Sequence, residues 1–170
     1  MNSIFNRRSI RKYKGKPIEK EKIEKLLRAA MQAPSAGNQQ PWEFIVIQQK
    51  DNLKKLSKMS PYAKPIEGAA AVFVLMADEK KMKFPGIWQQ DMAAAAENIL
   101  LEAVELDLGA VWLGVASIKE REDYIKEMFN LNENLKPFCV IALGYPDGQE
   151  NKFIDRFDEK RIHWDKTTVK

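Results

Sequence analysis

Four short apolar runs constrain the fold of this chain more than any other feature of its sequence. They are rich in Val, Ile and Phe, and they cover residues 42–47, 69–77, 110–116 and 137–143. β-Branched and aromatic residues fit a pleated sheet, and runs that are almost continuously apolar are typical of strands covered on both faces. The sequence therefore predicts a central sheet flanked by helices.

Helical patterns fill the intervals between these runs. After Pro17, apolar residues at spacings of three and four predict an amphipathic helix that Pro34 ends. Further helices are expected over residues 51–60, 88–108 and about 117–129, and in the last of these Ser117 and Glu120 have the spacing of a capping box. With 170 residues, of which 45% are hydrophobic, the chain can bury about 70% of its unfolded surface. The pattern predicts one α+β domain spanning residues 1–170.

The expected helix over residues 88–108 is apolar around more than one side. It contains four consecutive alanines, residues 93–96, which are followed by isoleucine, leucine and valine. Such a helix must be covered on more than one side, and one sheet of a chain this size covers only part of it. We therefore favour a homodimer in which a second copy covers the rest. The alternative is that alanine only reflects helix propensity.

The segment from Asp147 onward has turn residues and charges but little periodicity. It nevertheless contains Phe153, Phe157, Ile162 and Trp164, which are too apolar for a free tail. We expect this tail to lie across another surface, and the surface of a partner subunit is a candidate.

The scarcity of Cys and His excludes several classes of protein. Cys139 and His163 are the single representatives of their types, so a disulfide framework and a zinc site built from several such ligands are excluded. A Ser-His-Asp or Cys-His catalyst would have to use His163, in the tail. We therefore expect no metal site, and a hydrolase of either kind is disfavoured. The sequence also has no G-x-G-x-x-G or Walker spacing.

Two further absences bear on location. Residues 1–6 lack the basic and apolar parts of a secretory signal, and no run of 18 apolar residues occurs. Together with the single cysteine, these features predict a reduced cytoplasmic protein without a membrane span.

The positive charge is concentrated near the start of the chain. Residues 1–28 hold ten Lys and Arg against three Glu, which gives +7, so the net +4 of the chain leaves −3 for the remaining 142 residues. The densest part is RRSIRKY, residues 7–13. Such a local concentration favours a small anion over a long polyanion.

An extended backbone would place Arg7, Ser9 and Arg11 on one side and Arg8 and Ile10 on the other. Two guanidinium groups flanking a hydroxyl form a cradle suited to one phosphate, which Arg binds in bidentate fashion. Two alternatives to this phosphate site stay open at this point. The first is a solvated basic approach to the next helix. The second is a nucleic-acid-binding patch, which the acidic remainder of the chain makes less favourable.

A second polar segment, APSAGNQQPW, lies between the helix that Pro34 ends and the strand that begins at Trp42. Ser35, Asn38, Gln39 and Gln40 offer neutral donors and acceptors, and Gly37 permits close backbone approach. Amide groups suit the edge of a polar heterocycle, while arginines suit a phosphate, so the two segments together predict a mononucleotide site. The alternative is a loop that satisfies only its own backbone.

These segments, in this order, resemble the FMN-dependent nitroreductase family in its short form. The likeness rests on RRSIRKY, APSAGNQQPW, the stretch WQQDMAAAAENILLEAVELDLGAVWLGV and the strand end IALGYP, and it covers nearly the whole chain. The resemblance implies an α+β fold with a mostly antiparallel sheet of four to five strands, a long dimer-interface helix, and a C-terminal tail that wraps the partner. It also implies a homodimer with two FMN sites at its interface.

The resemblance assigns residues to the flavin. Its motif positions imply that Arg7, Arg8, Ser9 and Arg11 hold the phosphate and ribityl end. A loop from the partner would bring Pro34, Ser35, Gly37, Asn38 and Gln40. The backbone of Leu113, Gly114 and Val115 would lie along the isoalloxazine, with an amide near Gly114 bonded to N5. Arg156 in the tail would be a further phosphate ligand, with Arg161 as the alternative.

The activity implied by the resemblance is hydride transfer from NADH or NADPH to FMN, followed by reduction of a small-molecule acceptor at the same place. Nitroaromatics and quinones are the usual acceptors in such proteins, and relatives with specialised chemistry dehalogenate tyrosines or consume reduced flavin. The flavin carries the redox step, which fits a chain without catalytic side chains.

Aromatic residues near loops are candidates to line the substrate channel. We select Tyr62 and Trp88, because both lie next to irregular segments near Pro61 and Pro85. Trp88 is equally suited to anchor an interface, and Trp112, within an apolar run, is assigned to the core.

Overall fold

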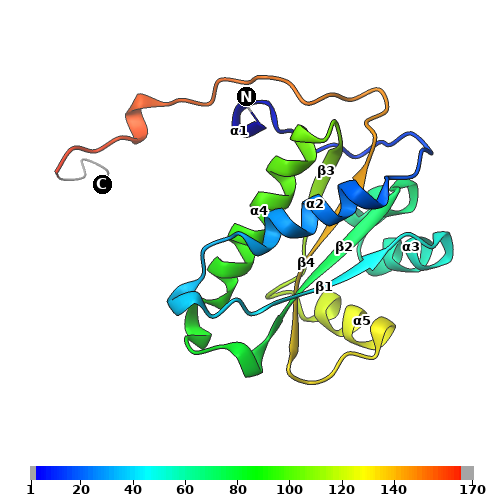
Figure 1. Cartoon of the computed structure of the whole chain (residues 1–170), viewed down its shortest axis with the longest axis vertical. Coiled ribbons are helices and arrows are strands. Elements are labelled where there is room, and N and C mark those ends of the chain that lie inside the picture. Colours follow the sequence, from blue (N-terminus) through cyan, green and yellow to red (C-terminus); the bar gives the residue numbers. More distant parts are fainter. Residues whose placement is uncertain (1–2, 166–170) are drawn as a thin grey trace.

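The computed structural model describes residues 3–165. Its centre is a four-stranded sheet in the order β1-β2-β4-β3 (Figure 1). The strands are β1 (Trp42–Ile47), β2 (Ala71–Asp78), β3 (Gly109–Gly114) and β4 (Leu135–Gly144). All three neighbouring pairs are antiparallel. The structure thus confirms the α+β class and the antiparallel sheet, and the strands lie within a few residues of the four apolar runs.

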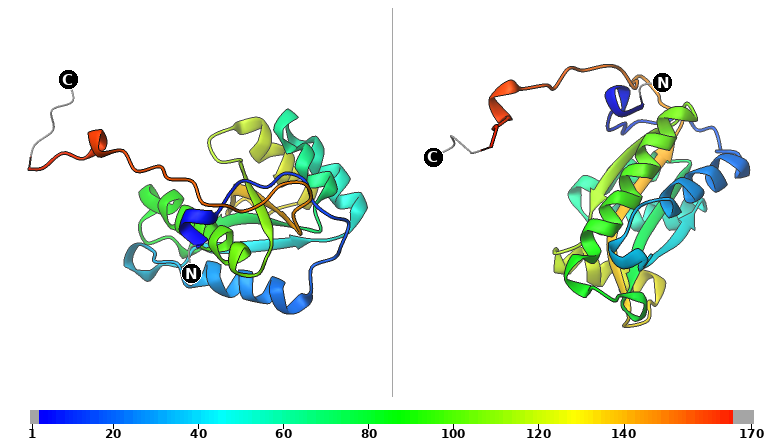
Figure 2. Two further views of the ribbon diagram at one scale, coloured as in Figure 1. Left: turned by 90° about the horizontal axis from the view of Figure 1, so that it is seen from above. Right: turned by 60° about the vertical axis from the view of Figure 1, so that its left-hand side comes forward.

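Helices cover both faces of the sheet (Figure 2). On one face lie α2 (Lys20–Met31) and α4 (Trp88–Glu105). On the other lie α3 (Lys50–Leu56) and α5 (Lys119–Phe129). A short helix, α1 (Ser3–Asn6), precedes the sheet. Six 3-10 segments complete the described elements: Ala36–Asn38, Ser57–Met59, Pro61–Gly68, Glu79–Lys81, Pro85–Ile87 and Glu159–Arg161.

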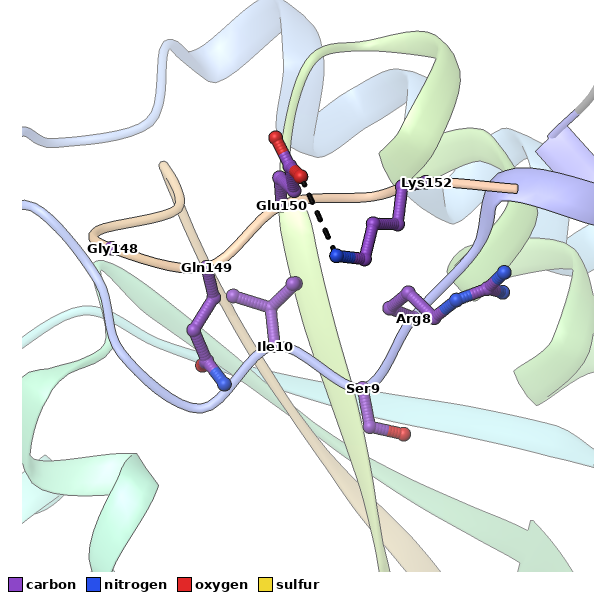
Figure 3. A pocket seen from close by; sticks show the side chains of 7 residues that line it. All are labelled: Arg8, Ser9, Ile10, Gly148, Gln149, Glu150 and Lys152. Atoms are coloured by element: carbon purple, nitrogen blue, oxygen red, sulfur yellow. Dashed lines mark ion pairs between the residues drawn. The ribbon is translucent and has the colours of Figure 1, made fainter. Parts of the chain in front are cut away.

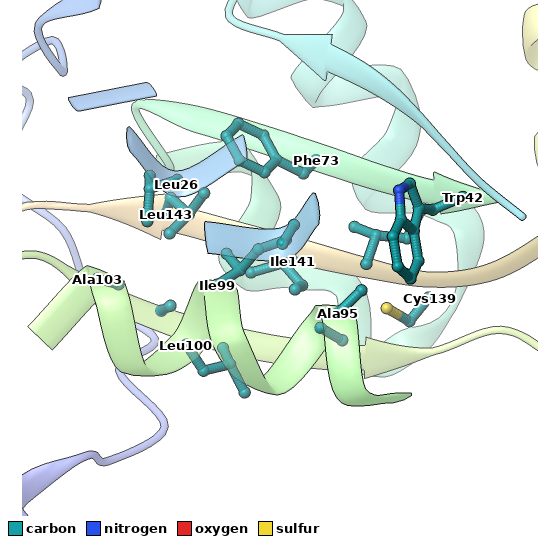
Figure 4. Close-up of a cluster of buried hydrophobic side chains, with 14 of the residues drawn as sticks. Leu26, Trp42, Phe73, Ala95, Ile99, Leu100, Ala103, Cys139, Ile141 and Leu143 are labelled. Atoms are coloured by element: carbon teal, nitrogen blue, oxygen red, sulfur yellow. The ribbon is translucent and has the colours of Figure 1, made fainter. Parts of the chain in front are cut away.

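Alternation along the central strands explains why their runs are continuously apolar. In β2, Phe73 and Leu75 face the layer of α2 and α4, whereas Val72 and Val74 face α3 and α5. Figure 4 shows the first of these two cores, in which Phe73 lies among side chains from β4 and α4. Because both faces of the sheet are buried, neither set of positions can be polar.

One chain covers more of α4 than the sequence predicts. The helix buries a face that includes Met92, Ile99 and Ala103 against the sheet, and α2 packs alongside it. The alanine run is divided, because residues 95 and 96 are buried whereas residues 93 and 94 are only half-buried. The half-buried side of α4 is therefore the part that remains available to a second copy.

The start of α5 differs from the predicted capping box. Ser117 has a left-handed backbone with φ of 69°, and the helix begins two residues later, at Lys119. The carboxylate that accepts the Ser117 N–H bond is that of Glu122, at 2.8 Å. The expected pairing with Glu120 fails because the turn at Ser117 shifts the helix start.

The start of the C-terminal tail lies beside the N-terminal segment. Residues 147–151 run beside the N-terminal segment, and the rest of the tail leaves the body (Figures 1 and 2). Its apolar side chains are exposed, and Phe157 and Trp164 reach 75% and 83%. Among residues 3–165, no helix has the length and apolar character needed to cross a membrane.

Candidate functional site: an arginine-rich edge and a polar loop

The basic segment runs extended along the open edge of β3. Ser9 forms a parallel bridge with Ala110, and the Ile10 N–H donates to the Ala110 carbonyl at 2.9 Å. The Ile10 side chain is 1% exposed and occupies the space where Gly109 has no Cβ, since a Cβ there would lie 2.6 Å from Ile10. Ile10 therefore anchors the segment, and its polar neighbours remain at the surface.

The first residues of the tail hold this segment in place. The Gln149 side-chain oxygen accepts the backbone N–H groups of Arg11 and Lys12, at 2.7 and 3.0 Å. Asn151 accepts the N–H of Arg8 at 3.1 Å through Oδ1 and donates to the Leu108 carbonyl at 3.0 Å through Nδ2. Sequence reasoning missed both amide side chains, although their period-two spacing beside an extended segment was a usable signal.

Three guanidinium groups from the two ends of the chain share one cavity. Arg7, Arg8 and Arg156 line it together with Asp155, and its volume is about 340 Å³. Burial, followed by the charges of Arg156 and Arg7, lowers the pKa of Arg8. The Arg8 Nε is buried and has no hydrogen-bond partner among residues 3–165. An orphaned cationic donor beside two further arginines fits an anionic ligand.

The negative charge near this cavity is smaller than the positive charge of its three arginines. Asp155 lines the cavity, and Glu97 Oε1 lies 3.7 Å from the Arg7 Nε. Within residues 3–165 the Arg8 guanidinium donates to backbone carbonyls alone, those of Arg7 and Phe5. Arg161, the alternative to Arg156, instead pairs with Asp158 at 3.2 Å. The geometry therefore favours Arg156 as the tail arginine of this cluster.

Arg11 does not share a cavity with Arg7. It lines a separate hollow of about 710 Å³ with Tyr13 and Lys64, and its Nη1 donates to the Ser9 carbonyl at 3.2 Å. Sequence reasoning missed Lys64, because it is distant from Arg11 in the sequence and becomes its neighbour when the chain folds. The predicted cradle of Arg7, Ser9 and Arg11 is thus divided between neighbouring hollows.

Ser9 lies between these two hollows. Figure 3 shows a third cavity, of about 500 Å³, that Ser9 lines together with Arg8 and Lys152. The side chains of Ser9 and Ile10 point to opposite sides of the segment there, as an extended backbone requires. Lys152 is paired with Glu150 at 3.7 Å, so its charge is partly neutralised.

The polar loop of residues 34–40 has an unusual backbone. Gly37, Asn38 and Gln40 have φ angles of 54°, 53° and 45°. The Gln40 N–H donates to Ser35 Oγ at 3.0 Å, and the Gln40 amide donates to Asn38 Oδ1 at 2.8 Å. Pro34 is exposed. The loop therefore forms some of its hydrogen bonds within itself, while its Asn38 and Gln40 side chains stay at the surface.

A buried polar pair, Asp91 and Gln39, holds this loop. Sequence reasoning did not identify Asp91, and it counted Gln39 among the available donors and acceptors, whereas the structure buries its side chain and bonds it inward. Asp91, in the first turn of α4, is 5% exposed and accepts the Ala36 N–H at 2.9 Å and the Gln39 side-chain amide. The Gln39 oxygen accepts the N–H groups of Lys83 and Phe84, both at 2.9 Å. An acid directly before the apolar stretch of residues 92–96 was the available signal for Asp91.

The turn after β3 offers backbone groups to its surroundings. β3 is an edge strand, and the carbonyl of Gly114 points away from β4, because it accepts from Arg121 Nη1 at 2.7 Å. The N–H of a strand residue points to the same side as its carbonyl, so the Gly114 N–H also faces outward. Gly114 is exposed, whereas its neighbours Leu113 and Val115 are buried.

The predicted substrate aromatics are not brought together within one chain. Tyr62 is 74% exposed in the 3-10 segment on the α3 side of the sheet. Trp88 packs on the α4 side, edge-on to Phe138 at 5.9 Å. Trp112, assigned to the core, is only half-buried and stacks edge-on against the same Phe138 at 5.5 Å.

The fold and these sites define a small α+β protein with an arginine-rich edge beside a turn whose backbone groups face outward. Comparisons with known proteins place the chain more closely. The model of the nitroreductase family matches residues 4–89 and 58–145. The chain belongs to the nitroreductase family.

Individual relatives support this membership. A candidate NADH oxidase structure from Clostridium acetobutylicum is 68% identical, with a TM-score of 0.96, over 97% of this chain and 99% of that one. A candidate NADH dehydrogenase/NAD(P)H nitroreductase from Archaeoglobus fulgidus is 45% identical over 98% of this chain and 97% of its own. A candidate nitroreductase in complex with FMN, from Desulfovibrio desulfuricans, is 29% identical, with a TM-score of 0.83, over 99% of this chain and 96% of that one.

Proposed function

We propose that this protein is an FMN-dependent NAD(P)H oxidoreductase that reduces nitroaromatic, quinone or related acceptors by a ping-pong mechanism. The observation that carries the proposal is the cluster of Arg7, Arg8 and Arg156, in which the Arg8 Nε has no hydrogen-bond partner within the described residues 3–165. Family membership and the FMN complex of the Desulfovibrio relative support the identity of the cofactor. The names of the Clostridium and Archaeoglobus relatives support the nicotinamide donor.

The length of β3 supports the proposed arrangement. Ser9 is bridged to Ala110 at one end of the strand, and Gly114 is its last residue. Four residues of a strand span about 13 Å, a separation that a ribityl phosphate arm and a flavin ring can bridge. The phosphate would lie with the arginines and the ring along residues 113–115. In this arrangement the outward N–H of Gly114 is the candidate donor to flavin N5.

The flavin, when bound, supplies the redox chemistry by accepting a hydride from the reduced nicotinamide and returning its electrons to the acceptor. The chain's own residues bind and orient. The arginines neutralise the phosphate, Gln149 and Asn151 keep the segment extended, and the apolar side chains of Leu113 and Val115 keep the turn rigid. Tyr62 and Trp88 stay proposals as substrate contacts.

The visible spectrum of the purified protein tests this function. We expect flavin absorption that bleaches on addition of NADH or NADPH and returns with a quinone. A colourless protein that takes up no FMN would contradict the proposal, and salt-sensitive nucleic-acid binding by that protein would favour the basic-module alternative. Oxidation of reduced flavin or dehalogenation of a halotyrosine, without quinone reduction, would indicate the specialised relatives.

We further propose that residues 1–170 form one flavin-binding domain of a cytoplasmic homodimer, with the tail of each chain wrapped around its partner. Support comes from Phe157 and Trp164, which are largely exposed within residues 3–165, from Phe153, which stays 60% exposed although its ring lies 6.2 Å from that of Phe5, and from the half-buried side of α4. The proposed loop of residues 34–40 would then serve the flavin of the partner chain.

Mixed dimers test this sharing. Arg8→Ala and Gln40→Ala each damage every site of their own homodimer, but a dimer with one chain of each type has one intact site if cradle and loop come from different chains. We expect mixing to restore flavin binding. If mixing restores none, the two segments serve the flavin from the same chain.

A further inference from the structure

A second group of cations in the basic segment lies beyond the arginines. Lys14 and Lys16 line a cavity of about 680 Å³, to which α3 contributes Lys50 and Lys54. We call it the lysine cavity; its lining residues are 13–17, 48, 50, 51, 53, 54 and 67–70. Its volume is in the range of small-molecule sites, roughly 300–1,000 Å³.

The lysine cavity carries an excess of positive charge. Four lysines line it against Asp51 and Glu67, which leaves a net charge of +2 (four minus two). Lys16 is paired outside the cavity with Glu19, at 3.3 Å. The other three lysines form no ion pair with any residue between 3 and 165. Lys14 and Lys16 belong to the basic N-terminal region, and Lys50 and Lys54 belong to a second basic stretch, residues 50–64, which holds five lysines against one aspartate. The fold brings these two basic stretches to one cavity.

The remaining walls are mostly apolar, with Gln48 as a polar exception, and they include one fixed aromatic ring. Leu53, Ala69 and Pro17 supply apolar surface. The Tyr13 hydroxyl, with its single proton, lies within hydrogen-bond distance of two carbonyl oxygens, that of Ile10 at 2.6 Å and that of Ala142 at 3.1 Å. Its ring also fills the space beside Gly144, where a Cβ would lie 2.8 Å from it. The ring therefore cannot turn away, and it presents a permanent flat edge to the cavity.

Lysines approach from two sides, because the 13–17 segment and α3 each bring a pair. Ammonium groups bind phosphate as point charges, and two separated pairs match two phosphate groups better than one. The apolar walls suit the ring of a nucleoside. We propose that the lysine cavity binds a nucleoside diphosphate. A concave site of this size fits a small molecule, whereas a duplex requires charges spread over an open face.

Two sources have this chemistry: a free nucleotide, and the diphosphate half of the nicotinamide donor. The second source rests on the proposed function, but binding itself does not. The lysine cavity and the hollow beside Arg11 share Tyr13, Glu67 and Gly68 as a common wall, so both sources are sterically reasonable.

Calorimetric titration of ADP into the full chain saturated with FMN tests the inference. We expect saturable binding that weakens about tenfold or more in Lys50→Gln/Lys54→Gln, because each charge-assisted bond lost costs on the order of a decade in affinity. The matched control is Lys55→Gln/Lys58→Gln, which removes the same charge from exposed positions outside the lysine cavity. NMR shifts on ADP addition should concentrate at residues 14–17, 50–54 and 68–70.

Several outcomes decide the matter. Absence of saturable ADP binding, equal loss in the control pair, or shifts confined to residues 7–11 would each overturn the inference. If ADP competes with NADH and the Lys50/Lys54 variant raises KM for NADH, the source is the donor. If ADP binds without changing KM, the source is a free nucleotide. Flavin content is read separately in every variant, so failure of the flavin site is distinguishable from failure of the lysine cavity.

Discussion

The basic segment and the polar loop, the two parts of the proposed flavin site, are built in opposite ways. The segment of residues 7–12 is held by Gln149 and Asn151, which are distant in the sequence. Its positive charge exceeds the negative charge of the nearby carboxylates, and within residues 3–165 the Arg8 Nε has no hydrogen-bond partner. The loop of residues 34–40 forms several hydrogen bonds within itself and is anchored by Asp91 of α4. The segment is thus ready to bind an anion, whereas the loop provides a preset shape.

The largest expected effect is on the loop and comes from Asp91→Ala. The substitution leaves the Ala36 N–H and the Gln39 amide without their buried acceptor, so we expect the free energy of unfolding to fall by about 2–4 kcal/mol. Denaturant titration measures this. The control is Asp123→Ala, which removes an exposed surface pair and should change stability by less than about 1 kcal/mol. Equal effects would show that Asp91 does not anchor the loop.

Arg156→Ala tests the segment instead. It should weaken FMN binding by about ten- to a hundredfold, because a charge-assisted hydrogen bond contributes roughly 1.5–3 kcal/mol. The fold should be unaffected, since the side chain is exposed in the tail. Arg161→Ala is the matched control, because Arg161 pairs with Asp158. Fluorescence titration with FMN separates the two, and a larger loss in Arg161→Ala would reverse the assignment of the tail arginine.

Gly37→Ala sharpens the idea that the loop shape is preset. Gly37 has φ of 54°, and a Cβ there would lie 2.5 Å from the Phe84 ring, so we expect a loss of about 1–2 kcal/mol. Gly15→Ala is the control, because a Cβ at that position would meet nothing within 4 Å. Thermal unfolding of the two variants gives the comparison. A Gly37→Ala protein as stable as the control would mean that the loop readily adopts another shape.

The smallest effect concerns acid stability next to the basic segment. The hydrogen bond from the Tyr145 hydroxyl, followed by one from a backbone N–H and then by that from Lys16, lowers the pKa of Glu19 to about 2 from its ordinary 4.5. A depressed carboxyl pKa stabilises the fold above about pH 4.5, and this contribution is lost as the pH falls towards 2. Glu19→Gln should therefore flatten the loss of stability over that interval. If the variant lost stability between pH 4.5 and 2 as steeply as the wild-type protein, the Glu19–Tyr145 hydrogen bond would contribute nothing to acid stability.

The sequence predicts the fold better than it predicts the geometry of the site. Apolar runs locate all four strands because burial on both faces of a sheet leaves a direct trace in composition. Asp91 and Lys64 were missed because their roles depend on contacts with residues distant in the chain. The division of Arg7 from Arg11 was also missed, because strand alternation gives the side of a segment but not which hollow each long side chain enters.

The affinities of this protein for FMN and for riboflavin, which differ only in the phosphate, test the role of the arginine cluster most directly. If the cluster binds that phosphate, FMN should bind at least about a hundredfold more tightly, since two or more charge-assisted bonds are at stake, and Arg8→Ala should remove most of the difference. Equal affinities of the wild-type protein for the two flavins would contradict the account.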